Sequence, residues 1–208
     1  MWLLENTLDS LLAPSLRSSI ETNLGKDTLV KIENRLAERH GLSLVQAIKD
    51  FYKFDSVLRE FFGAGADGLE KKFLENIIDV KISKNNNENW IEIRDSSLSK
   101  TFLECFADPD KKSILISVMD VPLIISDILE QCEIPQTSGY RKINTLIDSG
   151  LLISNGFELS KDGKKIKKYE SVFTNVKMDV VKNSVLVKVQ MKHHSLSDSS
   201  IIQIISTA

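Results

Sequence analysis

The sequence predicts a mainly α-helical fold with a small β component (α+β), and three observations lead to this class. Apolar residues recur at helical spacing through the first eighty or so residues. Further helical segments follow between about residues 97 and 149. From there to residue 191, apolar and polar residues alternate as they do in strands. We therefore expect the helices first and antiparallel strands last.

Length and composition are those of an ordinary globular protein. The chain has 208 residues, of which 42% are hydrophobic and 27% charged, enough for one large domain or two small ones. The formal charge of −2 argues weakly against a protein that coats nucleic acid, although the placement of charge matters more than its sum. No apolar run is long enough to cross a bilayer, and the first residues lack a basic segment, so we expect a cytoplasmic protein with no membrane partner.

The order of these patterns predicts four regions. Residues 1–84 are expected to form a helical sensor or assembly domain, because short glycine-marked breaks separate its helices. Residues 85–96 are expected to be a linker or a short hairpin, since the polar run Asn85–Asn89 is followed by the alternating segment Trp90–Ile93. Residues 97–192 should form the second domain, including C-terminal strands, and residues 193–208 a tail.

Two helices joined by a short turn are predicted between Ser126 and Ser149. Ser126 is expected to cap the first helix. Glu133-Ile134-Pro135 should form the turn, with Ile134 filling the gap between the helices. The second helix is expected to end at Ser149-Gly150. Its inner side should hold Tyr140, Ile143, Leu146 and Ile147.

The start of this second helix carries small, hydrogen-bonding and basic residues. Residues of this kind at a helix N-terminus are typical of a recognition helix, in which hydroxyls and basic side chains hold phosphates while other side chains reach base edges. Arginine can contact guanine and glutamine can contact adenine. The predicted DNA-binding residues here are Gln136, Thr137, Ser138, Tyr140, Arg141 and Lys142.

A lysine-rich hairpin is predicted directly after this helix. Phe157–Ser160 and Ile166–Tyr169 alternate and flank Asp162-Gly163, a strong hairpin-turn signal. Lysines on an edge hairpin can simply prevent aggregation, but behind a pair of helices they are placed to neutralise phosphates. We predict DNA contacts from Lys161, Lys164, Lys165 and Lys167.

Three segments of residues 97–192 resemble the winged helix-turn-helix regulators of the ArsR-like superfamily in archaea and bacteria. Phe106–Leu115 is similar to the opening helix of that family, Ile134–Ile143 to its recognition helix, and Asp148–Leu152 to the entry into its wing. The resemblance covers about half the chain and implies a transcriptional regulator that binds double-stranded DNA. Glu133 departs from the pattern, because the family more often has Gly or Asn in this turn.

A homodimer is expected, with the helix Leu98–Phe106 and the strands after Phe173 as candidate interfaces. Phe61–Glu70 resembles the small helical modules that accompany DNA-binding domains in ammonia-oxidising archaea, so the N-terminal domain is expected to meet an unknown effector or protein partner. One alternative is a winged-helix protein-interaction module in a transcription-related complex, which the acidic total, Glu133 and the apolar tail Ile201–Ile205 favour. Another is a ligand- or metal-responsive sensor whose DNA binding is switched.

No residue pattern favours catalysis, and we expect no enzymatic activity, cofactor or metal. His193-His194 lacks a cysteine or acidic partner at ligand spacing. Cys105 and Cys132 are far apart in apolar helical patterns, so we expect neither a disulfide nor a sensor site from them.

Overall fold

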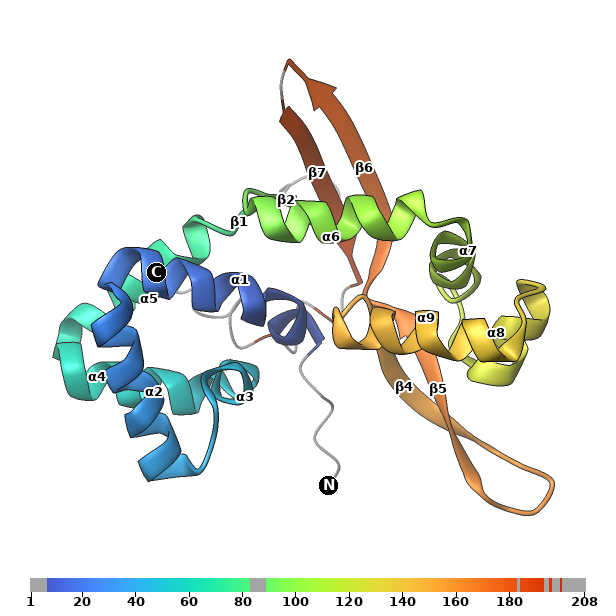
Figure 1. The fold of residues 1–208 in the computed structure, drawn as a ribbon, viewed down its shortest axis with the longest axis horizontal. Coiled ribbons are helices and arrows are strands. Elements are labelled where there is room, and N and C mark those ends of the chain that lie inside the picture. Colours follow the sequence, from blue (N-terminus) through green and yellow to red (C-terminus); the bar gives the residue numbers. More distant parts are fainter. Residues whose placement is uncertain (1–6, 83–88, 183, 193–194, 196–198, 200–208) are drawn as a thin grey trace.

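The computed structural model describes residues 7–82, 89–182 and 184–192, together with Ser195 and Ser199. Its helices lie mostly in the N-terminal and middle parts of the chain, and antiparallel sheets occupy the C-terminal part (Figure 1). The predicted mixed α+β class is therefore confirmed. None of the described helices is both long enough and apolar enough to span a membrane.

The first part of the chain folds into helices that pack around α1 (Figure 1). Ser43 caps α3, because its side chain accepts the Gln46 N–H while the Gln46 side chain accepts the Ser43 N–H. Phe51 and Phe54 are buried in the core rather than lining a surface. The elements are α1 (Thr7–Leu24), α2 (Lys26–His40), α3 (Leu44–Lys49), α4 (Phe51–Phe62), η1 (Gly63–Gly65) and α5 (Ala66–Glu75).

A four-stranded antiparallel sheet joins the two ends of the chain. Its strand order is β1-β2-β7-β6, so β2 pairs with a strand about a hundred residues away. The predicted hairpin region thus contributes strands to a sheet that it shares with the C-terminal segment. The domain boundaries themselves stay a prediction. The strands are β1 (Ile78–Ile82), β2 (Asn89–Ile93), β6 (Phe173–Val181) and β7 (Ser184–Met191).

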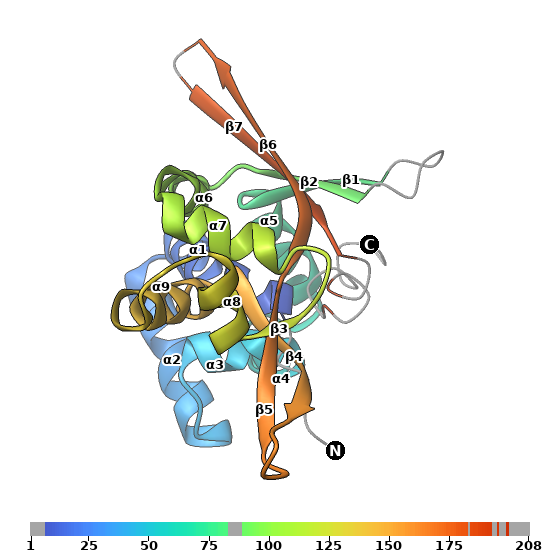
Figure 2. The same cartoon turned by 90° about the vertical axis from the view of Figure 1, so that its right-hand side faces the viewer.

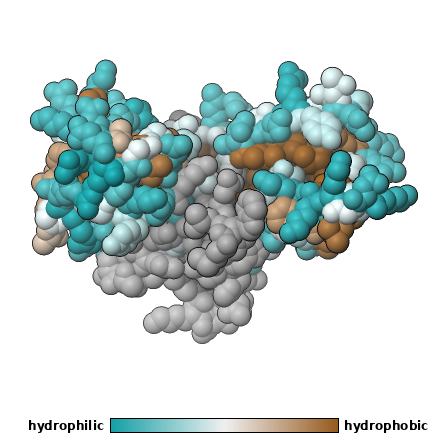
Figure 3. Space-filling view, turned by 90° about the horizontal axis from the view of Figure 1, so that it is seen from below, coloured by the Kyte–Doolittle hydropathy of each residue, from teal (hydrophilic) through white to brown (hydrophobic). Residues whose placement is uncertain are grey.

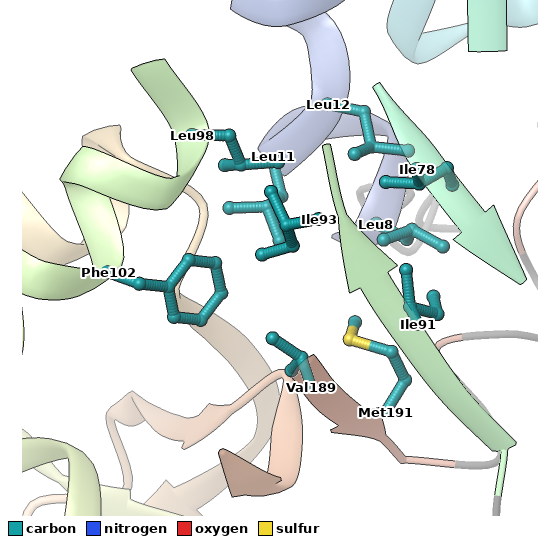
Figure 4. A pocket seen from close by; sticks show the side chains of 10 residues that line it. All are labelled: Leu8, Leu11, Leu12, Ile78, Ile91, Ile93, Leu98, Phe102, Val189 and Met191. Carbon is teal, nitrogen blue, oxygen red and sulfur yellow. The ribbon is translucent and has the colours of Figure 1, made fainter. Parts of the chain in front are cut away.

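One apolar face of this sheet is covered by α1 and by α6 (Ser96–Ala107), as Figure 4 shows. The gap between them is only about 10 Å³, which makes it packed core rather than a ligand site. Asp95 fixes the two helices to each other, because its Oδ1 caps α6 through the Leu98 N–H and also accepts the Ser15 hydroxyl at 2.8 Å. The lining residues are Leu8, Leu11, Leu12, Ile78, Ile91, Ile93, Leu98, Phe102, Val189 and Met191.

The middle of the chain forms three helices and a second, three-stranded antiparallel sheet of order β3-β5-β4. The β4–β5 hairpin of this sheet and the β6–β7 hairpin of the first sheet project from opposite sides of the molecule (Figure 2). The elements are α7 (Pro109–Ser117), β3 (Leu123–Ile124), α8 (Ile125–Gln131), α9 (Gln136–Asp148), β4 (Leu152–Leu159) and β5 (Lys165–Ser171).

Two buried contacts fix this middle part of the chain to the rest of the molecule. Lys192, just after β7, donates to Glu170 of β5 at 2.7 Å, and Asn155 of β4 donates to the other oxygen of Glu170 at 2.7 Å. At Gly150, directly after α9, the backbone passes so close to α1 that an added Cβ would lie 2.8 Å from the backbone nitrogen of Leu11. A side chain cannot be accommodated there without moving α1.

We expect Gly150→Ala to lower the free energy of unfolding by about 3 kcal/mol, because it combines a left-handed backbone at φ +73° with a clash against backbone atoms. Gly163→Ala is the matched control, since Gly163 has φ +75° but nothing within 4 Å of an added Cβ, and it should cost only about 1 kcal/mol. Urea denaturation followed by circular dichroism measures both. Equal losses in the two variants would show that the contact with α1 is not a constraint.

Candidate nucleic-acid interface

The helix α9 is held against α8 by close packing at a glycine. Gly139 is buried, and a Cβ added to it would lie 2.3 Å from Cδ2 of Leu129. The glycine inside the helix therefore permits close approach of the neighbouring helix. Ile134 is buried between the two helices, as predicted, and so are Ile143 and Leu146 on the inner side of α9. This packing fixes which side of α9 faces solvent.

Two sequence predictions about this helix pair are wrong. Ser126 does not cap α8, because the helix begins at Ile125 and follows directly on β3, while the Ser126 hydroxyl donates to the Asp127 side chain. Tyr140 does not lie on the inner side of α9, since it is 46% exposed. Its exposure places Tyr140 on the same outward side as the residues proposed to meet DNA.

The outward side of α9 presents most of the predicted residues to solvent. Gln136, Thr137 and Arg141 are exposed, and no described residue forms an ion pair with Arg141. Ser138 is half-buried, and its hydroxyl donates to the Pro135 carbonyl at 3.1 Å. Asn144, one turn further along, is also exposed, and the sequence analysis missed it although helical spacing from Tyr140 and Arg141 indicates it.

Lys142 points to α7 rather than to solvent. Its ammonium lies 2.7 Å from both carboxylate oxygens of Asp108 and 3.2 Å from Asp110. Asp108 also caps α7 by accepting the N–H groups of Asp110 and Lys111. The hydrogen bond from Lys142 holds the pKa of Asp108 below its usual range. Lys142 therefore joins α9 to α7, and we leave it out of the proposed DNA contacts.

The β4–β5 hairpin carries four exposed lysines around its turn. Lys161, Lys164, Lys165 and Lys167 are exposed, and none of them pairs with an acidic residue in the described part of the chain. The turn is closed by hydrogen bonds between Ser160 and Lys164, including one from the Lys164 N–H to the Ser160 hydroxyl at 3.0 Å. The four predicted lysines thus share one hairpin end.

Apolar side chains lie among these lysines. Phe157 is 52% exposed and Leu159 is 68% exposed. In the strand register they stand opposite Lys167 and Lys165, so all four share one face of the hairpin. Seen from the side to which this hairpin projects, the half of the molecule that holds α7–α9 and the hairpin shows hydrophobic surface bordered by hydrophilic residues (Figure 3). The surface is both cationic and apolar.

The charge of this region differs in sign from that of the whole chain. Residues 135–171 contain seven basic and four acidic residues, a formal charge of +3, whereas the chain as a whole carries −2. Glu133 lies in the turn before α9 with φ +55°, a left-handed backbone that Gly or Asn adopts more readily. Its geometry explains why Gly or Asn would be favoured at this position.

The acidic residues that could hold a cation lie elsewhere, on α4 and α5. Carboxylate oxygens of Asp55, Asp67 and Glu70 lie within 4.8 Å of one another. The guanidinium of Arg59 bonds to Asp55 at 2.7 Å and also to Asp67, so it already supplies a positive charge to the cluster. Glu70 is buried, and burial together with the neighbouring Asp55 raises its pKa to about 8. The charge of Arg59 and the raised pKa of Glu70 both reduce the net negative charge of this cluster.

His193, His194 and the tail segment 201–205 lie outside the described residues. Comparisons of this chain with protein-family profiles, curated proteins and solved structures found no match.

We expect Asp108→Ala to lower the free energy of unfolding by about 1–2 kcal/mol, because it removes the cap of α7 and the partner of Lys142. Asp110→Ala is the control: its 3.2 Å contact with Lys142 is more exposed, so the loss should stay below about 0.5 kcal/mol. Since the pKa of Asp108 is lowered, its contribution is present at neutral pH and is lost as the pH falls below its usual value of 3.8. Urea denaturation at neutral and acidic pH tests this, and equal losses at both would contradict it.

The raised pKa of Glu70 predicts a pH dependence of opposite sign. The folded state holds the proton up to about pH 8, whereas the unfolded state releases it near 4.5, so the free energy of unfolding should fall as the pH rises through this window. Glu70→Gln, a neutral mimic of the protonated acid, should flatten this fall. Glu75→Gln, at an exposed position on the same helix, should leave the slope unchanged. Urea midpoints measured across this window decide the matter.

Proposed function

We propose that this protein is a winged helix-turn-helix transcriptional regulator that binds double-stranded DNA. The element order α7-β3-α8-α9-β4-β5 with a β3-β5-β4 sheet supports this proposal, because it matches three helices followed by a hairpin wing. In this proposal α9 enters the major groove and the β4–β5 hairpin contacts the phosphate backbone beside it.

The observation that carries the proposal is the difference between paired and unpaired basic side chains on and next to α9. Lys142 forms an ion pair with Asp108, whereas Arg141 is exposed and has no ion-pair partner among the described residues. The four hairpin lysines are exposed in the same way. Unpaired cations cost little to transfer to phosphates, since no existing ion pair has to be broken. The proposed contacts are Gln136, Thr137, Ser138, Tyr140, Arg141, Lys161, Lys164, Lys165 and Lys167.

A second candidate is a winged-helix module that binds another protein. The exposed apolar side chains of Phe157 and Leu159 favour it, since apolar surface of this kind is typical of protein interfaces. For the N-terminal helices we propose an effector or protein partner, which could meet α4 at Tyr52, 78% exposed, and Phe61, 40% exposed.

The first test is fluorescence anisotropy of the whole chain with randomised duplex DNA at about 50 and 200 mM salt. Binding should weaken steeply with salt. Lys164→Ala/Lys165→Ala should reduce the slope of log affinity against log salt by about 2, one for each lost phosphate contact. Lys26→Ala/Lys31→Ala removes the same charge from exposed positions on α2 and should leave the slope unchanged.

Sequence recognition is tested next, on an operator selected from that pool. Arg141→Ala should lower specific affinity by about 1–3 kcal/mol while affinity for random DNA changes less. Absence of binding to any duplex at low salt would reject the DNA-binding proposal and favour the protein-interaction module. If Lys26→Ala/Lys31→Ala reduces the salt slope as much as Lys164→Ala/Lys165→Ala does, DNA affinity depends on the net charge of the chain and not on the hairpin.

A further inference from the structure

The strand β6 is an edge of the four-stranded sheet. In the strand order β1-β2-β7-β6, it pairs with β7 alone among the described residues. Its irregular pairing is confined to the base, between Phe173 and Asn175, so the stretch from Val176 to Val181 is regular strand, and one side of it pairs with no other strand in the described part of the chain. A regular free edge is a template for pairing with another strand.

This edge also exposes apolar side chains where the β6–β7 hairpin projects beyond α6 (Figures 1 and 2). Val180 is 80% exposed, Val181 49% and Val185 37%. Val180 and Val185 are paired across the hairpin, and the same face continues inward to Val187 and Val189, which are buried. The apolar face of the core therefore extends past the helices that cover it.

We propose that β6 pairs antiparallel with β6 of a second copy of this chain, with the twofold axis at Met178. The two sheets then form one continuous sheet across the dimer. In this register Met178 stands opposite the partner's Met178, and Val180 stands opposite the partner's Val176. The most exposed valine is thereby covered by apolar side chains on the same face of the sheet.

The charges of β6 favour this register over the two that are centred one residue away. With the axis at Met178, Lys177 stands opposite the partner's Asp179, and the twofold axis repeats the pair. An axis at Lys177 would place two lysines opposite each other, and an axis at Asp179 would place two aspartates opposite each other; directly opposed like charges disfavour both registers. Asp179 has no ion-pair partner among the described residues, while Lys177 lies 4.3 Å from the Trp90 ring on the same sheet. The partner's Asp179 would be the carboxylate that neutralises Lys177.

This interface gives a surface to the homodimer expected of a DNA-binding regulator, but it does not depend on DNA binding. The β6–β7 hairpin and the β4–β5 hairpin project from opposite sides, so the two interfaces use different residues (Figure 2). The experiments below contain no nucleic acid. Their failure is therefore distinct from a failure to bind DNA.

Disulfide crosslinking of the whole chain tests the register. Met178→Cys places the two new thiols opposite each other, at a separation that a disulfide can bridge. Val180→Cys is the matched control, because the two thiols would be offset by four residues along the strands, roughly 13 Å, and cannot join. Under mild oxidation Met178→Cys should form a covalent dimer, whereas Val180→Cys and the wild-type chain with Cys105 and Cys132 should not. No crosslink in Met178→Cys, or an equal yield in Val180→Cys, overturns the proposal.

A charge exchange tests the same register without new cysteines. Asp179→Lys places lysines opposite each other at both symmetric positions, and sedimentation equilibrium should show the dimer dissociation constant rising roughly tenfold. Adding Lys177→Asp in the same chain restores opposite charges in exchanged order and should restore the dimer. A wild-type chain that stays monomeric, or a dimer insensitive to Asp179→Lys, overturns the proposal.

Discussion

The pairing of β2 with β7 is the interaction on which the rest of this structure depends. It places Trp90 beside Gln190 and Ile91 beside Val189, so residues separated by about a hundred positions share one ladder. Because α1 and α6 cover the apolar face of that sheet, the N-terminal helices and the C-terminal strands have one core. The end of β7 then carries Lys192, whose buried ion pair with Glu170 fixes β5 and with it the second sheet. Disruption of the β2–β7 ladder would therefore separate β6 and β7 from β1 and β2, which follow the N-terminal helices. Contacts of such long sequence separation also form late and slowly in folding.

Two adjacent basic residues of α9 have different surroundings. Successive residues of a helix point about 100° apart, so Arg141 and Lys142 cannot face the same surroundings. Lys142 faces α7 and is held by Asp108, which joins the two helices through a charged hydrogen bond. Arg141 faces solvent as a consequence. The same ion pair that stabilises the helix packing therefore determines which cation of α9 stays available to a ligand.

Local patterns in the sequence predicted the local elements well. The hairpin turn at Asp162-Gly163, the end of α9 before Ser149-Gly150 and the strands after Phe173 all follow from residue type and spacing, and the structure confirms them. The wrong predictions concern residues whose position depends on a contact with a residue far away in the sequence. Ser126 looked like a cap, but β3 pairs with β5 and brings the chain into α8 at Ile125. Lys142 looked like a free cation because its partner Asp108 is 34 residues away in the sequence. No local pattern in the sequence reveals the β2–β7 pairing, since each strand is short and neither specifies its partner.

The two projecting hairpins differ in composition in a way that bears on what each can contact. In the β4–β5 hairpin, Phe157 and Leu159 share a face with Lys165 and Lys167, and Lys165 lies 5.9 Å from the Phe157 ring. Removing water from this face is favourable only when the partner carries negative charge that offsets the charge of the lysines. The β4–β5 hairpin is therefore suited to contact an anionic surface. The end of the β6–β7 hairpin exposes valines beside one lysine and one aspartate, which compensate each other when the strand meets its own copy. Charge balance, more than apolar area, thus distinguishes a surface suited to a polyanion from one suited to self-association.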